Sequence, residues 1–127
     1  NPIRIVIDKQ LRLDGSLHLF DESVPTLVYS LKEHPRTKQV EYITLQPEKS
    51  LLPQILSDLS QRRIQTLLVE GGSQLLQSFI DENLWDEAFV EKSNIELSSG
   101  VKSPIISTEH DCVIDKSFGV CVAHYSR

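Results

Sequence analysis

Apolar positions in the first two thirds of the chain follow two alternating patterns, short β-branched runs and longer stripes at helical spacing. The short runs predict four strands, at residues 3–8, 26–30, 40–45 and 64–69, and the last strand is expected to be buried. The stripes predict two helices, at residues 51–63 and 73–83, and Ser50 is a candidate N-cap for the first. Alternating strands and helices are typical of an α/β fold with a parallel sheet.

The pattern changes in the last third of the chain. Short apolar pieces predict strands at residues 88–91 and 95–97, and residues 112–115 and 120–125 predict a terminal hairpin. Such closely spaced strands favour antiparallel pairing at the edge of the sheet. We therefore expect a single domain over residues 1–127, in which helices flank a mixed, mainly parallel sheet with a C-terminal antiparallel hairpin.

Charge and cysteine content narrow the class of protein. The net charge is −5, from 18 acidic and 13 basic residues, which argues against a nucleic acid or an anionic membrane as the main partner. No apolar run is long enough for a transmembrane helix. Cys112 and Cys121 flank the predicted hairpin turn; reduced thiols are favoured, and a disulfide between opposed positions stays open. His110 and His124 complete no recognised zinc ligand set, so no metal site is expected.

The turn Glu70-Gly71-Gly72 joins the fourth predicted strand to the second predicted helix. Open α/β sheets bind ligands at the carboxyl ends of their strands, and two glycines allow a ligand to approach the backbone closely. The N–H groups at the start of the following helix favour a phosphate, and the Glu70 carboxylate can accept a hydrogen bond from a polar substrate. The turn alone leaves a purely structural role open, because close helix packing also requires glycine.

Four motifs in order resemble the carboxyl-terminal reductase domain of the bifunctional riboflavin-biosynthesis deaminase/reductase. Residues 1–8 resemble the family's Pro-x-Arg-Val-Val-Leu-Asp strand, residues 69–75 its Val-Glu-Gly-Gly-x-x-Leu signature, residues 84–87 its Leu-Val-Asp-Glu segment, and residues 99–106 its Gly-rich loop ending in Pro-Leu-Leu. The four motifs are spread over residues 1–106, which is most of the chain. The resemblance implies a dihydrofolate-reductase-like fold and membership of a reductase domain.

The same resemblance implies an oxidoreductase of riboflavin biosynthesis. Its reaction is the NADPH-dependent reduction of 5-amino-6-(5-phosphoribosylamino)uracil to the ribitylamino product, within a larger cytoplasmic protein that forms a homodimer and carries an N-terminal zinc deaminase domain. The motif match implies that Glu70 contacts the substrate. It identifies no catalytic residue. The residues implied to bind NADPH are Lys9, Gly72, Ser73, Gln74, Leu75 and Leu76.

One departure from the family pattern bears on activity. The family's amino-terminal strand with Lys-x-Ala-x-Ser-x-Asp-Gly, the helix after it and an Asp-Asp-Pro-x-Leu-x-x-Arg segment do not precede Asn1. We therefore expect a fragment of a reductase domain that lacks half of the site and is poorly active alone. The alternatives are a catalytically incompetent dimerisation or cofactor-binding module of the same fold, or another dihydrofolate-reductase-like enzyme that reduces a pteridine or pyrimidine.

Overall fold

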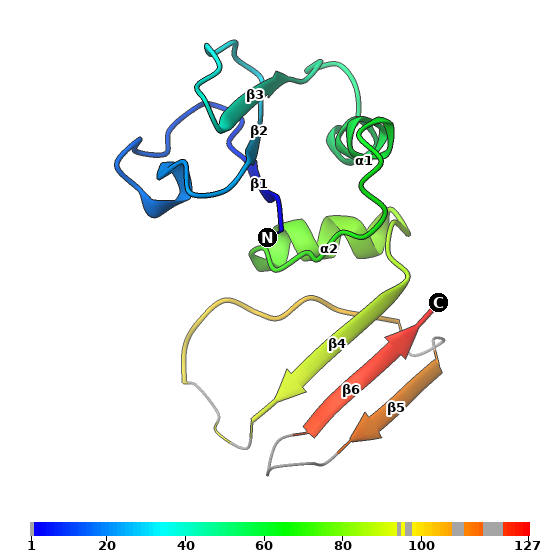
Figure 1. Ribbon diagram of the computed structural model, residues 1–127. Coiled ribbons are helices and arrows are strands. Elements are labelled where there is room, and N and C mark those ends of the chain that lie inside the picture. Colours follow the sequence, from blue (N-terminus) through cyan, green and yellow to red (C-terminus); the bar gives the residue numbers. More distant parts are fainter. Residues whose placement is uncertain (1, 94, 96–97, 108–110, 116–120) are drawn as a thin grey trace. The chain divides into compact units, whose positions relative to one another are not determined.

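A computed structural model describes residues 2–93, 95, 98–107, 111–115 and 121–127, with backbone alone for 111–115 (Figure 1). The chain divides into two compact units, Asn1–Thr66 and Leu67–Arg127, and each is described by itself. Among the described residues, no helix is long and apolar enough to cross a membrane, and no group of three or more His, Cys, Asp or Glu side chains could hold a metal ion.

The first unit is built on a parallel sheet with strand order β1-β2-β3. The strands are β1 (Arg4–Ile7), β2 (Thr26–Ser30) and β3 (Val40–Thr44). All five residues of β2 are buried, as expected for a central parallel strand with both faces covered. The three strands predicted from the β-branched runs in this part of the chain are therefore confirmed.

Helix α1 (Leu51–Gln61) packs against the sheet through a polar network as well as an apolar stripe. Leu52, Ile55 and Leu59 are its buried residues. The hydroxyl of Tyr29, which is fully buried on β2, donates a hydrogen bond of 2.7 Å to Oδ2 of Asp58 on α1. This bond fixes the helix to the centre of the sheet, because a buried phenol requires a partner.

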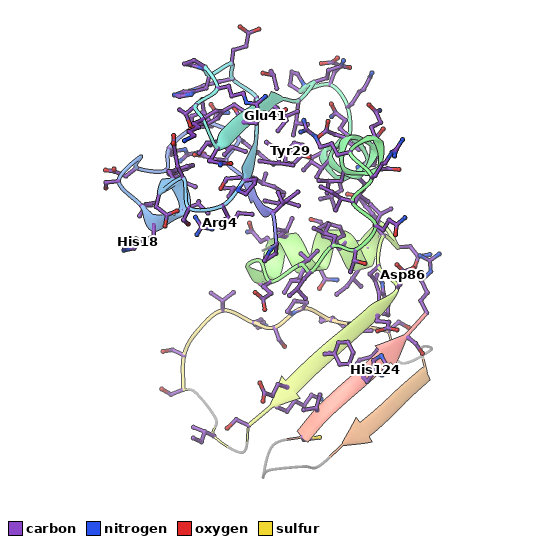
Figure 2. All side chains as sticks on the ribbon, viewed as in Figure 1. Arg4, His18, Tyr29, Glu41, Asp86 and His124 are labelled. Atoms are coloured by element: carbon purple, nitrogen blue, oxygen red, sulfur yellow. The ribbon has the colours of Figure 1, made fainter. Side chains whose placement is uncertain are left out.

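Arg62, at the end of α1, completes the network. Its Nε lies 2.8 Å from Oδ2 of Asp58, and its Nη2 lies 2.6 Å from Oε1 of Glu41 on β3. Hydrogen bonds to Glu41 and Asp58 raise the pKa of the Arg62 guanidinium. Tyr29 and Glu41 lie on neighbouring strands, on the side of the sheet that faces α1 (Figure 2).

Ser50 is the N-cap residue of α1, as predicted, but its side chain makes no capping hydrogen bond. The amide of Gln54, one turn into the helix, organises this end instead. Its Oε1 accepts from Gln46 N at 2.9 Å, and its Nε2 donates to Gln46 O and Ser50 O, each at 3.1 Å. An amide offers both a donor and an acceptor, so it can tie the preceding loop to the helix in a way that a hydroxyl cap cannot.

The second unit contains helix α2 (Ser73–Asp81) and an antiparallel sheet with strand order β4-β6-β5. The strands are β4 (Glu87–Lys92), β5 (Asp111–Asp115) and β6 (Cys121–Ser126), so the predicted terminal hairpin is confirmed. The parallel and antiparallel strands of the predicted fold are thus both present, in two separately hydrogen-bonded sheets. The strand predicted at residues 95–97 lies mostly outside the described residues, and Ile95 itself is not in a strand.

The register of the hairpin bears on the two cysteines. Cys112 pairs across the ladder with Tyr125, while Cys121 pairs with Lys92 of β4. The two cysteines are therefore not directly opposed positions, and Cys121 is a free, half-buried thiol. The Cys112 side chain lies outside the described residues.

The buried strand predicted at residues 64–69 is wrong. This segment follows α1 and has no strand pairing, and Leu68 within it is 79% exposed. An apolar run becomes a strand only when a neighbour supplies a hydrogen-bonding ladder, and no described strand pairs with this one. The Gly-Gly turn therefore follows an unpaired connection that crosses the boundary between the two units.

Candidate functional site

The two glycines of the turn before α2 have different structural reasons to be glycine. A Cβ built on Gly71 would lie 2.5 Å from Cδ2 of Leu75 and 3.2 Å from its Cβ and Cγ, so any side chain at Gly71 would displace Leu75. A Cβ on Gly72 would meet nothing within 4 Å, and the backbone there (φ −61°, ψ 164°) is open to any residue. The exposed space beside Gly72 is therefore available to a ligand.

The start of α2 presents unused backbone donors next to that space. The carbonyl of Gly72 accepts from the N–H groups of Leu75 at 3.0 Å and Leu76 at 3.2 Å, which close the first turn. No acceptor in the described part of the chain bonds the N–H groups of Ser73 and Gln74, and the first turn holds no side-chain cap and no acidic residue. Free N–H groups and the positive end of the helix dipole make this a suitable position for an anion.

The other residues carried over by motif have more varied surroundings. Glu70 is exposed, and its carboxylate has no hydrogen bond or ion pair within the ranges that the structure describes. Leu75 and Leu76 are half-buried, and their backbone N–H groups are already used within the helix. Lys9 belongs to the first unit, where it is exposed directly after β1 and its carbonyl accepts from Leu31 N at 3.0 Å.

Gln77 is a residue of this region that the sequence did not single out. Its side-chain Oε1 accepts from Ile105 N at 2.8 Å, and its Nε2 donates to Ile105 O at 3.3 Å and to Asp81 Oδ1 at 2.7 Å. The side-chain amide of Gln77 thus bonds both the N–H and the C=O of Ile105, which is 28 residues away. These bonds tie the 99–106 motif to α2. A glutamine on a helix surface gives no sequence signal for such a role.

Replacement of Gln77 by alanine is expected to release the 99–106 segment without unfolding α2. The Ile105 N–H loses its acceptor, so amide hydrogen exchange at Ile105 is expected to become about tenfold faster for a loss of about 1.4 kcal/mol of local protection. Gln74→Ala is the matched control, because Gln74 is an exposed glutamine on the same helix and its side chain has no described partner. If hydrogen exchange at Ile105 is unchanged in Gln77→Ala, the Gln77–Ile105 hydrogen bonds do not hold the 99–106 segment against α2.

Comparison with known proteins assigns the chain first to a class of fold. The structure of riboflavin biosynthesis reductase Rib7 from Saccharomyces cerevisiae matches 98% of this chain and 69% of its own, with a TM-score of 0.79 at 15% identity. A pyrimidine reductase-like protein from Corynebacterium diphtheriae matches 98% of this chain and 60% of its own, with a TM-score of 0.78 at 18% identity. The chain has the dihydrofolate-reductase-like α/β fold of these reductases.

The family follows from sequence. Residues 1–91 match the model of the RibD C-terminal domain, and the chain belongs to that family. It is 31% identical over 91 residues to riboflavin biosynthesis protein RibD of Haemophilus influenzae, covering 70% of this chain and 24% of that protein. It is 30% identical over 93 residues to 2,5-diamino-6-ribosylamino-4(3H)-pyrimidinone 5′-phosphate reductase of Archaeoglobus fulgidus, covering 68% of this chain and 42% of that protein. The chain therefore spans less than half the length of either relative.

Proposed function

We propose that this chain is part of an NADPH-dependent oxidoreductase that reduces 5-amino-6-(5-phosphoribosylamino)uracil to its ribitylamino product in riboflavin biosynthesis. The proposal is carried by the match of residues 1–91 to the RibD C-terminal domain. It is supported by the Archaeoglobus fulgidus relative, whose name is that of a pyrimidinone phosphate reductase. Because the chain spans 24% and 42% of the two relatives, the activity is assigned to the protein that contains it.

The residues at the start of α2 suit a phosphorylated dinucleotide. The open space beside Gly72 admits a ligand to the backbone, and the N–H groups of Ser73 and Gln74 can donate to a phosphate oxygen. Leu75 and Leu76 follow on the same turn and offer apolar contact, since their own N–H groups are already bonded. NADPH, when bound, supplies a hydride to C1 of the opened sugar, and the chain's task is to hold and orient the reactants.

Glu70 is proposed to contact the substrate. An ionised carboxylate is an acceptor only, and a pyrimidinedione ring with amino substituents offers N–H donors of matching chemistry. The carboxylate is exposed and makes no contact with the described residues, so a substrate does not compete with an internal partner. Lys9 is proposed to border the cofactor.

We propose that residues 1–127 belong to one reductase domain, that a zinc deaminase domain precedes it in the parent chain, and that the protein works in the cytoplasm as a homodimer. Phe89, which is 67% exposed on β4 and stacks on His124 of β6 at 4.3 Å, is the residue of this sheet that we propose to lie at the dimer contact.

Glu70→Ala tests the assignment of the substrate contact. In the full-length protein we expect the KM for the pyrimidine substrate to rise about tenfold, as for loss of one charge-assisted hydrogen bond, with the affinity for NADPH unchanged. Glu82→Ala is the control, because Glu82 is an exposed carboxylate at the other end of α2. A KM that stays at the wild-type value in Glu70→Ala would remove Glu70 from the substrate site.

A further inference from the structure

Asp8 is a buried residue directly after β1, and it holds the turn that follows, residues 9–13, which we call the β1 turn. Asp8 is 9% exposed. Its Oδ1 accepts from Arg12 N at 3.0 Å, and its Oδ2 accepts from Leu13 N at 2.9 Å. The Leu11 N–H donates to Asp8 O at 3.2 Å. The main chain and the side chain of Asp8 therefore both bind the backbone of the β1 turn.

The Asp8 carboxylate is ionised. Burial raises its pKa, but hydrogen bonds from the N–H groups of residues 10–13 outweigh burial, so the pKa lies below its usual value. None of the ion pairs among the described residues includes Asp8. Backbone N–H groups thus stabilise this buried charge, because charge-assisted hydrogen bonds are stronger than those between neutral groups. In the same way the carboxylate fixes the backbone around it.

Two further contacts hold the β1 turn against the end of β2. The Leu31 N–H donates to Lys9 O at 3.0 Å, and Lys32 Nζ donates to Gln10 O at 3.2 Å. Leu11, in the middle of the turn, has a left-handed backbone with φ of 54°, which is uncommon for a bulky residue. Such a conformation persists only where the surroundings fix it, and residues of this kind cluster at ligand sites.

We propose that Asp8 is a positioning residue for cofactor binding, because it fixes the β1 turn in the geometry in which Lys9 meets the cofactor. In the proposed function, on which this role rests, Lys9 borders the cofactor. The Lys9 carbonyl is held by Leu31, while its exposed side chain has no partner among the described residues. The turn also follows the carboxyl end of a parallel strand, the edge at which open α/β sheets bind ligands.

Asp8 acts through the backbone, since both of its oxygens accept N–H groups of the turn. A turn that is already ordered in the free protein does not have to be ordered when the ligand binds, and the free-energy cost of binding is lower by that amount. The expected signature is therefore a change in cofactor affinity, with no change in the rate of the chemical step.

Asp8→Asn tests this role, because the amide keeps the size of the side chain but turns one acceptor into a donor. Its NH2 group faces a backbone N–H, so the β1 turn loses a hydrogen bond. In the full-length protein we expect KM for NADPH to rise about tenfold, with kcat and KM for the pyrimidine substrate unchanged. Asp14→Asn is the matched control, because Asp14 is an exposed carboxylate of the same loop that accepts from Ser16 N at 2.8 Å, outside the β1 turn.

Two further measurements separate positioning from a general loss of structure. Amide hydrogen exchange at Leu13 is expected to become about tenfold faster in Asp8→Asn and to stay unchanged in Asp14→Asn. Because Asp8 acts through Lys9, the effects of Asp8→Asn and Lys9→Gln on KM for NADPH are expected to be less than additive. Circular dichroism checks folding. If Asp8→Asn does not fold, Asp8→Ser takes its place, because a hydroxyl accepts an N–H without a fixed donor.

The outcomes distinguish this role from the proposed function. If the wild-type protein neither binds nor oxidises NADPH, the proposed function fails and the role of Asp8 fails with it. If the wild-type protein uses NADPH, and exchange at Leu13 accelerates in Asp8→Asn while KM for NADPH is unchanged, only the positioning role is overturned. Equal losses in kcat and in both KM values, or strictly additive effects with Lys9→Gln, would also overturn it.

Discussion

Replacing Gly72 by serine is expected to weaken NADPH binding at least about tenfold while leaving the fold as stable as before. Serine fits the backbone at this position, meets no atom of the chain and is a slightly better N-cap than glycine, so stability should rise by about 0.3 kcal/mol. Its side chain fills the space through which a ligand reaches the backbone, at a cost of about 1.4 kcal/mol or more in binding. Fluorescence titration with NADPH and thermal unfolding measure the two effects separately.

Gly71→Ser is the matched variant with the opposite expectation. The added Cβ overlaps Leu75, and overpacking of this kind costs about 1–3 kcal/mol of stability. If Gly72→Ser lost stability as Gly71→Ser does, or kept full affinity for NADPH, the space beside Gly72 would not be a ligand site.

Asp58→Ala is expected to destabilise the protein by about 2–3 kcal/mol. The substitution leaves the Tyr29 hydroxyl without an acceptor at a fully buried position, which costs about 1–3 kcal/mol, and it removes one of the two carboxylates bonded to Arg62. The exposed part of the ion pair adds at most about 1 kcal/mol. Urea unfolding followed by circular dichroism gives the difference in the free energy of unfolding.

The Tyr29→Phe variant makes this prediction specific to the hydroxyl. In the double variant Tyr29→Phe/Asp58→Ala, the hydroxyl is removed together with its acceptor, so no buried donor is left unpaired. Its loss of stability is therefore expected to be smaller than the sum of the losses in the two single variants. Strictly additive losses would mean that the Tyr29–Asp58 bond does not couple α1 to the sheet.

Local apolar patterns in the sequence predicted three strands of the first unit and both helices. Runs rich in β-branched residues predicted β1, β2 and β3, and the run is most apolar in β2, the central strand, which is buried on both faces. The stripes at helical spacing predicted α1 and α2 to within two residues at each end. The run at residues 64–69 has the same composition but no ladder, and composition cannot supply a partner strand.

In the candidate site, too, the sequence predicted local features and missed long-range contacts. The sequence located the Glu70-Gly71-Gly72 turn, but the different roles of the two glycines depend on where Leu75 packs. The contact between Gln77 and Ile105 spans 28 positions and the contact between Lys32 and Gln10 spans 22, so neither leaves a local motif. Such long-range pairs of generic polar residues become visible only in the folded chain.

Titration of the ¹⁵N-labelled protein with NADPH tests the central claim, that the start of α2 binds the cofactor. We expect saturable shifts of the Ser73 and Gln74 amide resonances, because their N–H groups have no acceptor among the described residues. In Gly72→Ser we expect the same shifts to require at least about tenfold more NADPH. If these two amides stay unshifted while NADPH saturates the protein, or if NADPH does not bind at all, the claim is contradicted.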